Sequence, residues 1–311
     1  MDKTEPEKET LSDSTEEKQK QATESKEKSF RTPPKVDRKP WHGLWALTNR
    51  DLRKWYTNPI QLVVSLIQPI VWLGLFGKAL NFGSFIAGSG SQLSIAQQNA
   101  ILTSFFGTPS YFSFLACGML AFIVLFTSAF SGMSVVFDRR FGFLNKALST
   151  PVARGSIVMG KILQSVGRSL VQAAIILVIA VLLGMEITHF SIQGVAGTFV
   201  VIFLMGIGLS ALFTMLALRS ADWQTQMAII NLINLPLLFA SNALFPTKIM
   251  PPWLQDVVKV NPVSYANDAT RQLLLGATGM NSLWVDFAVL IGFAVILSAV
   301  GIILSWKLLS K

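Results

Sequence analysis

Hydrophobic residues occur along this chain in long runs that shorter polar stretches separate. A helix needs about 20 apolar residues to cross the hydrocarbon core of a bilayer. Six runs reach that length and predict transmembrane helices at Ile60–Leu80, Tyr111–Val136, Ile157–Leu183, Gly194–Leu218, Gln226–Phe245 and Val285–Trp306. The pattern therefore predicts an all-α integral membrane protein.

The composition agrees with this prediction, because 51% of the residues are hydrophobic and 14% are charged, against about 25% charged residues in soluble domains. Residues 1–30 hold 6 of the 26 basic and 9 of the 17 acidic residues. They are polar and contain a single aromatic residue, so we expect residues 1–40 to form a disordered cytoplasmic tail. The rest of the chain is basic, but it lacks the soluble basic domain that nucleic-acid binding would need.

Lysine and arginine are unevenly distributed among the connections, and this predicts the orientation, since cytoplasmic loops are enriched in basic residues. Seven basic residues lie between Arg31 and Lys54, before the first span, whereas residues 81–110 and 186–193 contain none. Both termini are therefore predicted to be cytoplasmic. The connection 246–284 carries three basic residues on the predicted outer side, which weakens the pattern without reversing it.

Residues 41–58 predict an amphipathic helix that lies on the membrane surface. Its tryptophan, tyrosine and leucine side chains fall on one helical face, with Arg50, Arg53 and Lys54 opposite. Such a helix buries its tryptophans at the interface and directs its cations to the cytoplasm or to lipid phosphates. It serves either as a simple anchor or as a lever on the cytoplasmic surface.

Residues 246–284 form an apolar connection that several prolines divide. Because proline interrupts helices, we expect short helices here. We further expect them to form an outer re-entrant helical hairpin before the last span.

One segment matches the glycine and lysine spacing of a phosphate-binding loop, with Gly155, Gly160 and Lys161. That loop requires Ser or Thr after the lysine and a β-strand before the first glycine. Ile162 follows instead, and the match begins a predicted span. We interpret it as a chance match.

Enzyme chemistry has little support in this sequence. The two histidines, His42 and His189, have no partner at metal-ligand spacing. Cys117 is the only cysteine, which excludes an intrachain disulfide. No span contains paired carboxylates, so no catalytic residue, metal site or cofactor is predicted in this chain.

Polar side chains inside the spans are the better functional candidates, because they are costly in a bilayer. Near the start of the third span, we expect Lys161 to extend to the cytoplasmic headgroups, while Arg168 either does the same or faces the bundle. In the fifth span, asparagines near one face make interhelical hydrogen bonds or line a substrate path. The candidate path residues are Arg168, Asn231, Asn234 and Asn242.

The fourth span repeats small residues every four positions, at Gly206, Ser210 and Thr214. This spacing predicts close helix packing.

Two separated segments carry a family resemblance. Phe137–Lys161 contains D-R-R-x-G-x-x-x-x-x-L-S-T-P-V-A-R and then G-K. The last connection contains F-P-x-x-x-M-P-P-W-L and, over Asn261–Arg271, N-P-V-S-Y-A-N-D-A-T-R. With six predicted spans and an amphipathic helix before them, residues 41–311 resemble the permease subunit of type 2 ABC transporters, especially the daunorubicin-resistance drug exporters.

The resemblance implies a permease domain over residues 60–306 that has no nucleotide-binding site of its own. ATP and Mg²⁺ would bind to a separate ABC ATPase, present in two copies on a homodimer of this chain in the plasma membrane. Residues 137–156 would form the cytoplasmic coupling segment. The implied ATPase contacts are Asp51, Arg53, Lys54, Asp138, Arg139, Arg140, Asn145, Lys146 and Arg154. Asn145 stands where the family commonly has an acidic residue.

We therefore expect an exporter that moves a hydrophobic or amphipathic compound, drug-like or lipid-like, outward, as in multidrug resistance. Spans rich in Phe and containing Met suit an adaptable apolar path better than an ion-selective pore. Export of a lipid-linked glycan or polysaccharide is the alternative within the family. A non-transporting membrane scaffold or receptor is the alternative from a different class.

Overall fold

The computed structural model describes residues 40–78, 94–143, 154–186, 191–220 and 222–309. Every regular element within these ranges is a helix, which confirms the predicted all-α class. Two predicted segments lie outside the described residues, namely the tail before residue 40 and residues 144–153 of the coupling segment.

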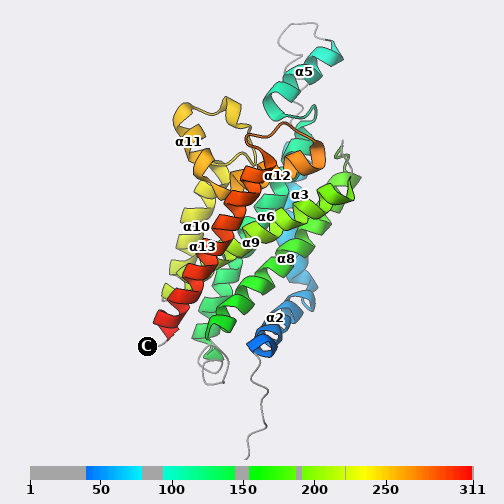
Figure 1. Cartoon of the computed structure of the whole chain (residues 1–311). Helices are drawn as coiled ribbons and strands as arrows, with labels where there is room; N and C mark the ends of the chain where they lie inside the picture. Colours follow the sequence, from blue (N-terminus) through cyan, green and yellow to red (C-terminus); the bar gives the residue numbers. More distant parts are fainter. Residues whose placement is uncertain (1–39, 79–93, 144–153, 187–190, 221, 310–311) are drawn as a thin grey trace, which may run out of the picture. The chain divides into compact units, whose positions relative to one another are not determined.

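Long helices that lie side by side form the body of the molecule (Figure 1). They are α3 (Pro59–Trp72, continued by the π-helix η1, Leu73–Lys78), α6 (Tyr111–Arg140), α8 (Arg154–Leu182), α9 (Ile192–Arg219), α10 (Trp223–Phe239) and α13 (Leu283–Leu309). Helix α6 packs against α8, α9, α10 and η1. It is apolar around its whole circumference, and this is the pattern of a helix that others surround.

Five of the described helical stretches are long and apolar enough to cross a membrane. They are Pro59–Gly77, Ala96–Arg140, Gly155–Leu182, Ile192–Arg219 and Leu283–Ser305. Helix α10 corresponds to the predicted span Gln226–Phe245, but it ends at Phe239 and has 17 residues. At 1.5 Å per residue its length is about 26 Å, slightly less than the hydrocarbon thickness of about 30 Å. The six-span count therefore stays a prediction.

Helix α2 (Pro40–Tyr56) lies against α8, and it begins at the end of the bundle where α13 ends (Figure 1). Its buried face matches the predicted apolar face only in part. Thr48, Asp51 and Trp55 are buried, whereas Trp45 is 66% exposed. The helix thus packs on the bundle through a mixed polar and apolar face.

Short helices gather at the opposite end of the bundle (Figure 1). They are α5 (Ile95–Phe106), the 3-10 helix η2 (Thr247–Ile249), α11 (Pro252–Val260) and α12 (Pro262–Leu275). Pro252 and Pro262 stand in the first turns of α11 and α12, where the missing N–H of proline has no intrahelical partner to lose. The short helices in the last connection are confirmed, whereas a re-entrant hairpin stays a prediction.

Helix α5 lies in a segment that was expected to be only a connection. A capping box begins it, because the Ser94 hydroxyl accepts from the Gln97 backbone while the Gln97 side chain accepts from the Ser94 backbone. The spacing of Ser94 and Gln97 before an apolar run is the sequence signal that could have revealed this helix.

The predicted close packing of the fourth span is confirmed. Gly206, Ser210 and Thr214 are buried where α9 meets α6 and α8. The Ser210 hydroxyl lies 2.8 Å from the Ser165 hydroxyl of α8 and 3.1 Å from the Ser128 hydroxyl of α6. Small residues therefore let three helices meet closely in the middle of the bundle.

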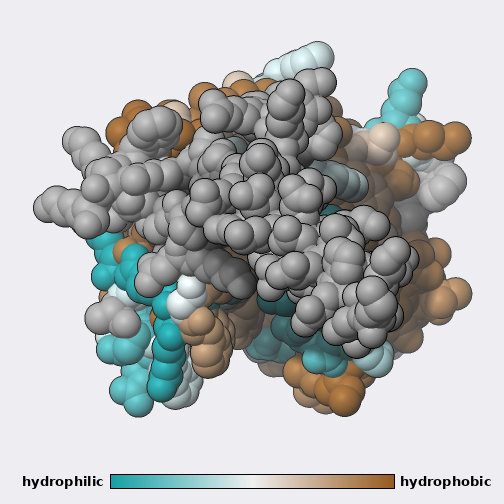
Figure 2. Space-filling model, turned by 90° about the horizontal axis from the view of Figure 1, so that it is seen from below, coloured by the Kyte–Doolittle hydropathy of each residue, from teal (hydrophilic) through white to brown (hydrophobic). Residues whose placement is uncertain are grey.

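Apolar side chains remain exposed around the sides of the bundle, most of all on α3 and α13. Ile67 is 50% exposed and Val295 is 62% exposed. Seen along the bundle from the α2 end, hydrophobic residues occupy much of the rim (Figure 2). An apolar surface of this extent is stable against lipid chains and would aggregate in water.

The contact between α6 and α9 can be tested at a glycine. A Cβ added at Gly132 would lie 2.7 Å from the carbonyl oxygen of Phe213, whereas one added at Gly292 of α13 meets nothing within 4 Å. We predict that Gly132→Ala destabilises the purified protein by about 1–3 kcal/mol, as overpacking does. Thermal unfolding in detergent measures this, with Gly292→Ala as the matched control that leaves stability unchanged or raised. Equal unfolding temperatures for the two variants would contradict the close contact.

Candidate functional site

A buried lysine joins three helices at the α2 end of the bundle. The Lys161 ammonium of α8 lies 2.6 Å from the carboxylate of Asp51 in α2 and 2.5 Å from that of Asp138 in α6. Lys161 is only 7% exposed, so the expectation that it extends to the lipid headgroups is wrong. A buried charge must be paired, and two carboxylates from distant parts of the chain pair this one.

Arg50 completes this cluster, which we call the charge network: Arg50, Asp51, Asp138 and Lys161. The Arg50 side chain bonds to Asp51, with Nε at 2.8 Å, and its Nη2 lies 3.4 Å from Asp138. Its guanidinium also lies 3.6 Å from the ring centre of Phe143. Two cations and two carboxylates balance one another, so the network carries no net charge.

The geometry of α2 and α8 explains why the network can form. A Cβ at Gly160 would lie 3.3 Å from the Cβ of Leu47 in α2, so the glycine lets the two helices approach closely. The glycine and lysine that resemble a phosphate-binding loop lie inside α8. The structural role of Gly160 and Lys161 is therefore to seat α2 on α8.

The electrostatics of Asp51 favour its ionised form. Burial by itself raises the pKa of this carboxyl, but Lys161 and Arg50 outweigh burial and hold the pKa below its ordinary value of 3.8. A carboxylate with a lowered pKa stabilises the fold above its unfolded-state pKa and loses that contribution only as the pH falls through the lowered value. The Asp51 ion pairs thus persist throughout the physiological pH range.

The residues predicted to contact an ATPase occupy different environments in the structure. Arg53, Lys54 and Arg140 are exposed at the α2 end. Asp51 and Asp138 belong to the charge network and hold helices together. Asn145 and Lys146 lie outside the described residues, as does the side chain of Arg154.

Arg139 donates hydrogen bonds to carbonyl groups at the end of another helix. Its guanidinium donates to the carbonyls of Leu218, at 2.6 Å, and Ser220, at 3.2 Å. These carbonyls belong to the C-terminal end of α9, where the helix leaves acceptors unpaired and favours a cation. Arg139 therefore positions α6 against α9.

The predicted path residues of α10 do not share one environment. Asn231 is exposed, whereas Asn234, one turn later, is 2% exposed. Neither amide atom of Asn234 has a hydrogen-bond partner in the described part of the chain. Asn242 follows the end of α10 and is also buried.

Arg168 lines a pocket of about 310 Å³ between α2, α3, α6 and α8. Its Nη2 donates to the backbone carbonyl of Asp51 at 3.0 Å. Nearby, Gln172 accepts from the Thr127 hydroxyl and donates to the Ser65 hydroxyl, each at 2.6 Å. Arg168 thus faces α2 and this pocket, and its role in a substrate path stays a prediction.

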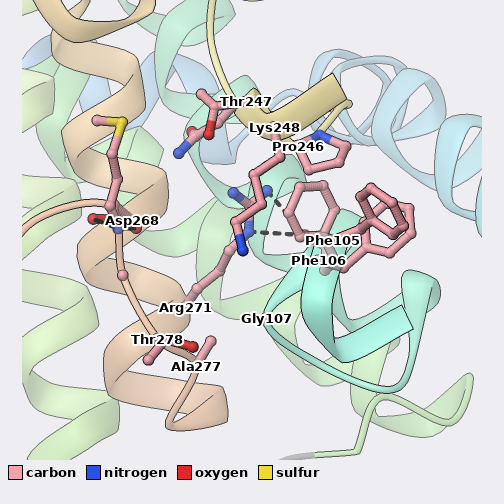
Figure 3. A pocket seen from close by; sticks show the side chains of 14 residues that line it. Phe105, Phe106, Gly107, Pro246, Thr247, Lys248, Asp268, Arg271, Ala277 and Thr278 are labelled. Atoms are coloured by element: carbon pink, nitrogen blue, oxygen red, sulfur yellow. Dashed lines mark hydrogen bonds between the residues drawn. The ribbon is translucent and has the colours of Figure 1, made fainter. Parts of the chain in front are cut away.

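A second pocket, of about 370 Å³, lies at the opposite end between α5, η2 and α12. Figure 3 shows Lys248 and Arg271 there beside the rings of Phe105 and Phe106. Arg271 donates to the carbonyls of Phe114 and Ala243, both at 3.2 Å, and stacks on the Phe114 ring. Sequence reasoning recognised this motif but assigned no role to its arginine, which ties α12 to α6 and to the segment that follows α10.

Comparison with known proteins identifies the family to which this chain belongs. Residues 42–275 match the ABC-2 type transporter family. The chain belongs to that family. The matched part is therefore the membrane permease of an ABC transporter, as the two sequence motifs predicted.

Several relatives share most of this permease. The protein named as transport permease ycf38 of Pyropia yezoensis is 33% identical over 229 residues, which cover 73% of this chain and 72% of the relative. The daunorubicin resistance ABC transporter permease protein DrrB1 of Streptomyces coeruleorubidus is 26% identical, over 71% of each chain. The protein named as doxorubicin resistance ABC transporter permease protein DrrC of Mycobacterium tuberculosis is 26% identical, over 74% of this chain and 75% of the relative.

The charge network gives a stability prediction for the permease. Lys161→Met leaves the buried carboxylate of Asp51 and the partly buried one of Asp138 with one arginine, so we predict a loss of about 3–5 kcal/mol, as when one partner of a buried ion pair is removed. Lys259→Met is the matched control, since Lys259 pairs with Asp256 on the surface, where both side chains are exposed. That change should cost at most about 1 kcal/mol. Chemical or thermal unfolding in detergent compares them, and similar losses for the two variants would refute the central role of Lys161.

Proposed function

We propose that this chain is the permease subunit of an ATP-driven exporter that moves a hydrophobic or amphipathic compound outward across the plasma membrane. A separate ABC ATPase supplies the energy. Permeases of this family generally work with an ATPase subunit. The drug-resistance names of two relatives favour an apolar or amphipathic substrate over a small ion.

The charge network is the observation that carries this proposal. It ties α2 to the last turns of α6 and the first turns of α8, and these are the two helices that the coupling segment connects. A displacement of the coupling segment or of α2 would therefore move α6 and α8 together. Rigid-body tilting of helices joined in this way is a common means of domain movement.

The proposed ATPase contact surface consists of the exposed cations at the α2 end, Arg53, Lys54 and Arg140, with Asn145, Lys146 and Arg154 of the coupling segment. In the proposed orientation this end is cytoplasmic, as are both termini. Two ATPase copies would bind a homodimer of the permease, since twofold symmetry is the commonest closed assembly.

Co-expression with candidate ABC ATPases tests the proposal. An exporter subunit co-purifies with its ATPase, raises ATP hydrolysis, and lowers the accumulation of a fluorescent amphipathic compound in cells. ATP-dependent movement of a lipid-linked glycan instead would select the alternative within the family. Binding of a cytoplasmic protein without any stimulated hydrolysis would select a scaffold or receptor.

Charge reversal at the proposed contact surface gives a specific prediction. We expect the triple variant Arg53→Glu, Lys54→Glu and Arg140→Glu to reduce co-purified ATPase at least about tenfold. An acidic ATPase surface that attracts these cations would repel glutamates in their place, because like charges across an interface repel. Lys259→Glu, an exposed reversal at the other end of the bundle, is the control and leaves the yield unchanged. Arg139 is left intact because its loss would uncap α9. Undiminished ATPase recovery would make these cations topology signals only.

The α10 asparagines give a second prediction. Replacing Asn234 by Leu removes buried amide atoms that have no partner among the described residues, so folding should be unchanged or improved. Asn231 is exposed, so a leucine at this position disturbs no buried contact. We predict that Asn231→Leu and Asn234→Leu together lower transport about tenfold or more while dimer assembly and ATPase binding persist. Loss of assembly would show that the asparagines serve packing.

A further inference from the structure

We propose that the pocket around Arg168 binds an amphiphile with an anionic headgroup, such as a lipid phosphate or carboxylate, taken up from the membrane on the α2 side. That the bound molecule is also the exported substrate rests on the proposed function. The binding itself follows from the charges and walls of the pocket.

Arg168 carries a positive charge that the described chain does not balance. The two carboxylates of the charge network are both paired with Arg50 and Lys161, and Arg168 is a third cation beside Asp51 that makes no ion pair among the described residues. Arg168 itself donates to a backbone carbonyl and lies 6.0 Å from the ring centre of Trp55, and its Nε is buried without a hydrogen-bond partner in the described residues. One uncompensated positive charge therefore faces the pocket.

The described walls of the pocket supply no anion to balance Arg168. Residues 144–153, which connect α6 to α8, contain no aspartate or glutamate. The lining of the pocket contains none either. Because partly buried charges are stabilised by opposite charges, the pocket as lined by the described residues is complementary to an anionic ligand.

The walls of the pocket suit the other half of an amphiphile. Phe122, Phe126 and Phe130 follow one another at four-residue spacing on α6, so they line one face of that helix. The rings of Phe122 and Phe126 stack with centres 4.4 Å apart. Phe130 is 50% exposed, so the aromatic wall extends to the side of the bundle.

Helix α3 contributes a polar stripe opposite this wall. Gln61, Ser65 and Gln68 share one face of α3 and line the pocket. The two glutamine side chains are exposed there and can donate to headgroup oxygens. An arginine and two amides thus lie beside an aromatic wall. The polar groups suit the headgroup of an amphiphile, and the aromatic wall suits its apolar chains.

The position of Arg168 favours an amphiphile over free phosphate. Arg168 lies inside the candidate membrane span Gly155–Leu182, about 10 Å along α8 from Lys161 at 1.5 Å per residue. A soluble anion would have to leave water to reach it. An amphiphile arrives from the bilayer with its chains against the phenylalanines.

The charge also selects against cationic compounds. At an effective dielectric constant of 20, a second positive charge about 7 Å from Arg168 is disfavoured by about 10-fold or more. The aromatic wall alone would accept a cation, so the arginine is the residue that determines specificity.

Photo-labelling of the full-length permease tests the site without any ATPase. The protein is reconstituted in phosphatidylcholine nanodiscs that contain a trace of photoactivatable phosphatidic acid or, in parallel, photoactivatable phosphatidylcholine, and labelled peptides are mapped. We expect the anionic probe to label α3 and the Phe122–Phe130 face of α6 about tenfold more than the zwitterionic probe. Equal labelling by the two probes would overturn the proposal.

Variants identify the group responsible. Arg168→Gln should bring labelling by phosphatidic acid down to the phosphatidylcholine level, while Arg168→Lys keeps most of the preference. Arg53→Gln, which removes an exposed cation of α2 outside the pocket, is the matched control and leaves the preference intact. A preference that survives Arg168→Gln, with folding confirmed by unfolding temperature, would refute the role of the arginine.

A second variant covers the case in which Arg168→Gln does not fold. Val64 lines the pocket and is 60% exposed, so Val64→Trp has room on the surface and obstructs the opening. Loss of labelling in this variant supports the site, and unchanged labelling argues against it. Competition separates the two anion sources: unlabelled phosphatidic acid should displace the probe, whereas displacement by inorganic phosphate instead would overturn the amphiphile.

The outcome is distinguishable from failure of the proposed function. If labelling fails while ATP-dependent export is observed, only the Arg168 pocket is wrong. If labelling succeeds while no ATPase ever associates, the pocket stands and the exporter proposal falls.

Discussion

The two ion pairs of Lys161 hold together parts of the chain that are far apart in sequence. Removing a charge from water costs several kcal/mol, and this cost is offset only when well-placed opposite charges surround the group. Asp51 and Asp138 provide those charges, and Arg50 pairs with the other oxygen of Asp51 and with the same oxygen of Asp138 that Lys161 contacts. The buried lysine therefore constrains where α2, α6 and α8 can lie, because any separation of these helices would leave a charge unpaired.

Much of the α2 end follows from this constraint. With Asp51 held on Lys161, the backbone of α2 accepts a hydrogen bond from Arg168, and Trp55 closes one side of the Arg168 pocket. The same helix leaves Arg53 and Lys54 facing outward. In the proposed exporter, the ATPase contact surface and the amphiphile pocket are thus two sides of one docked helix. Movement of α2 would change both together.

Sequence reasoning succeeded where one segment's own pattern decides the outcome. The apolar runs of α6, α8 and α9 predicted their spans, and the small residues of α9 predicted their tight packing. It failed where distant partners decide. Lys161 looked like a residue that extends to the headgroups, because its two carboxylates are 110 and 23 residues away in sequence. Likewise, nothing local to Arg139 indicates that it caps α9.

The sequence by itself determined the helical class, most of the membrane spans, the family, and the residue types available at the α2 end. Hydrophobic periodicity and motif order are local properties, so they can be read along the chain. Only the tertiary structure decided which charges are consumed in holding helices and which remain for partners. A charge's role depends on what surrounds it in space, and the packing of α2 on α8 left Arg168 as a third cation beside Asp51 that makes no ion pair among the described residues.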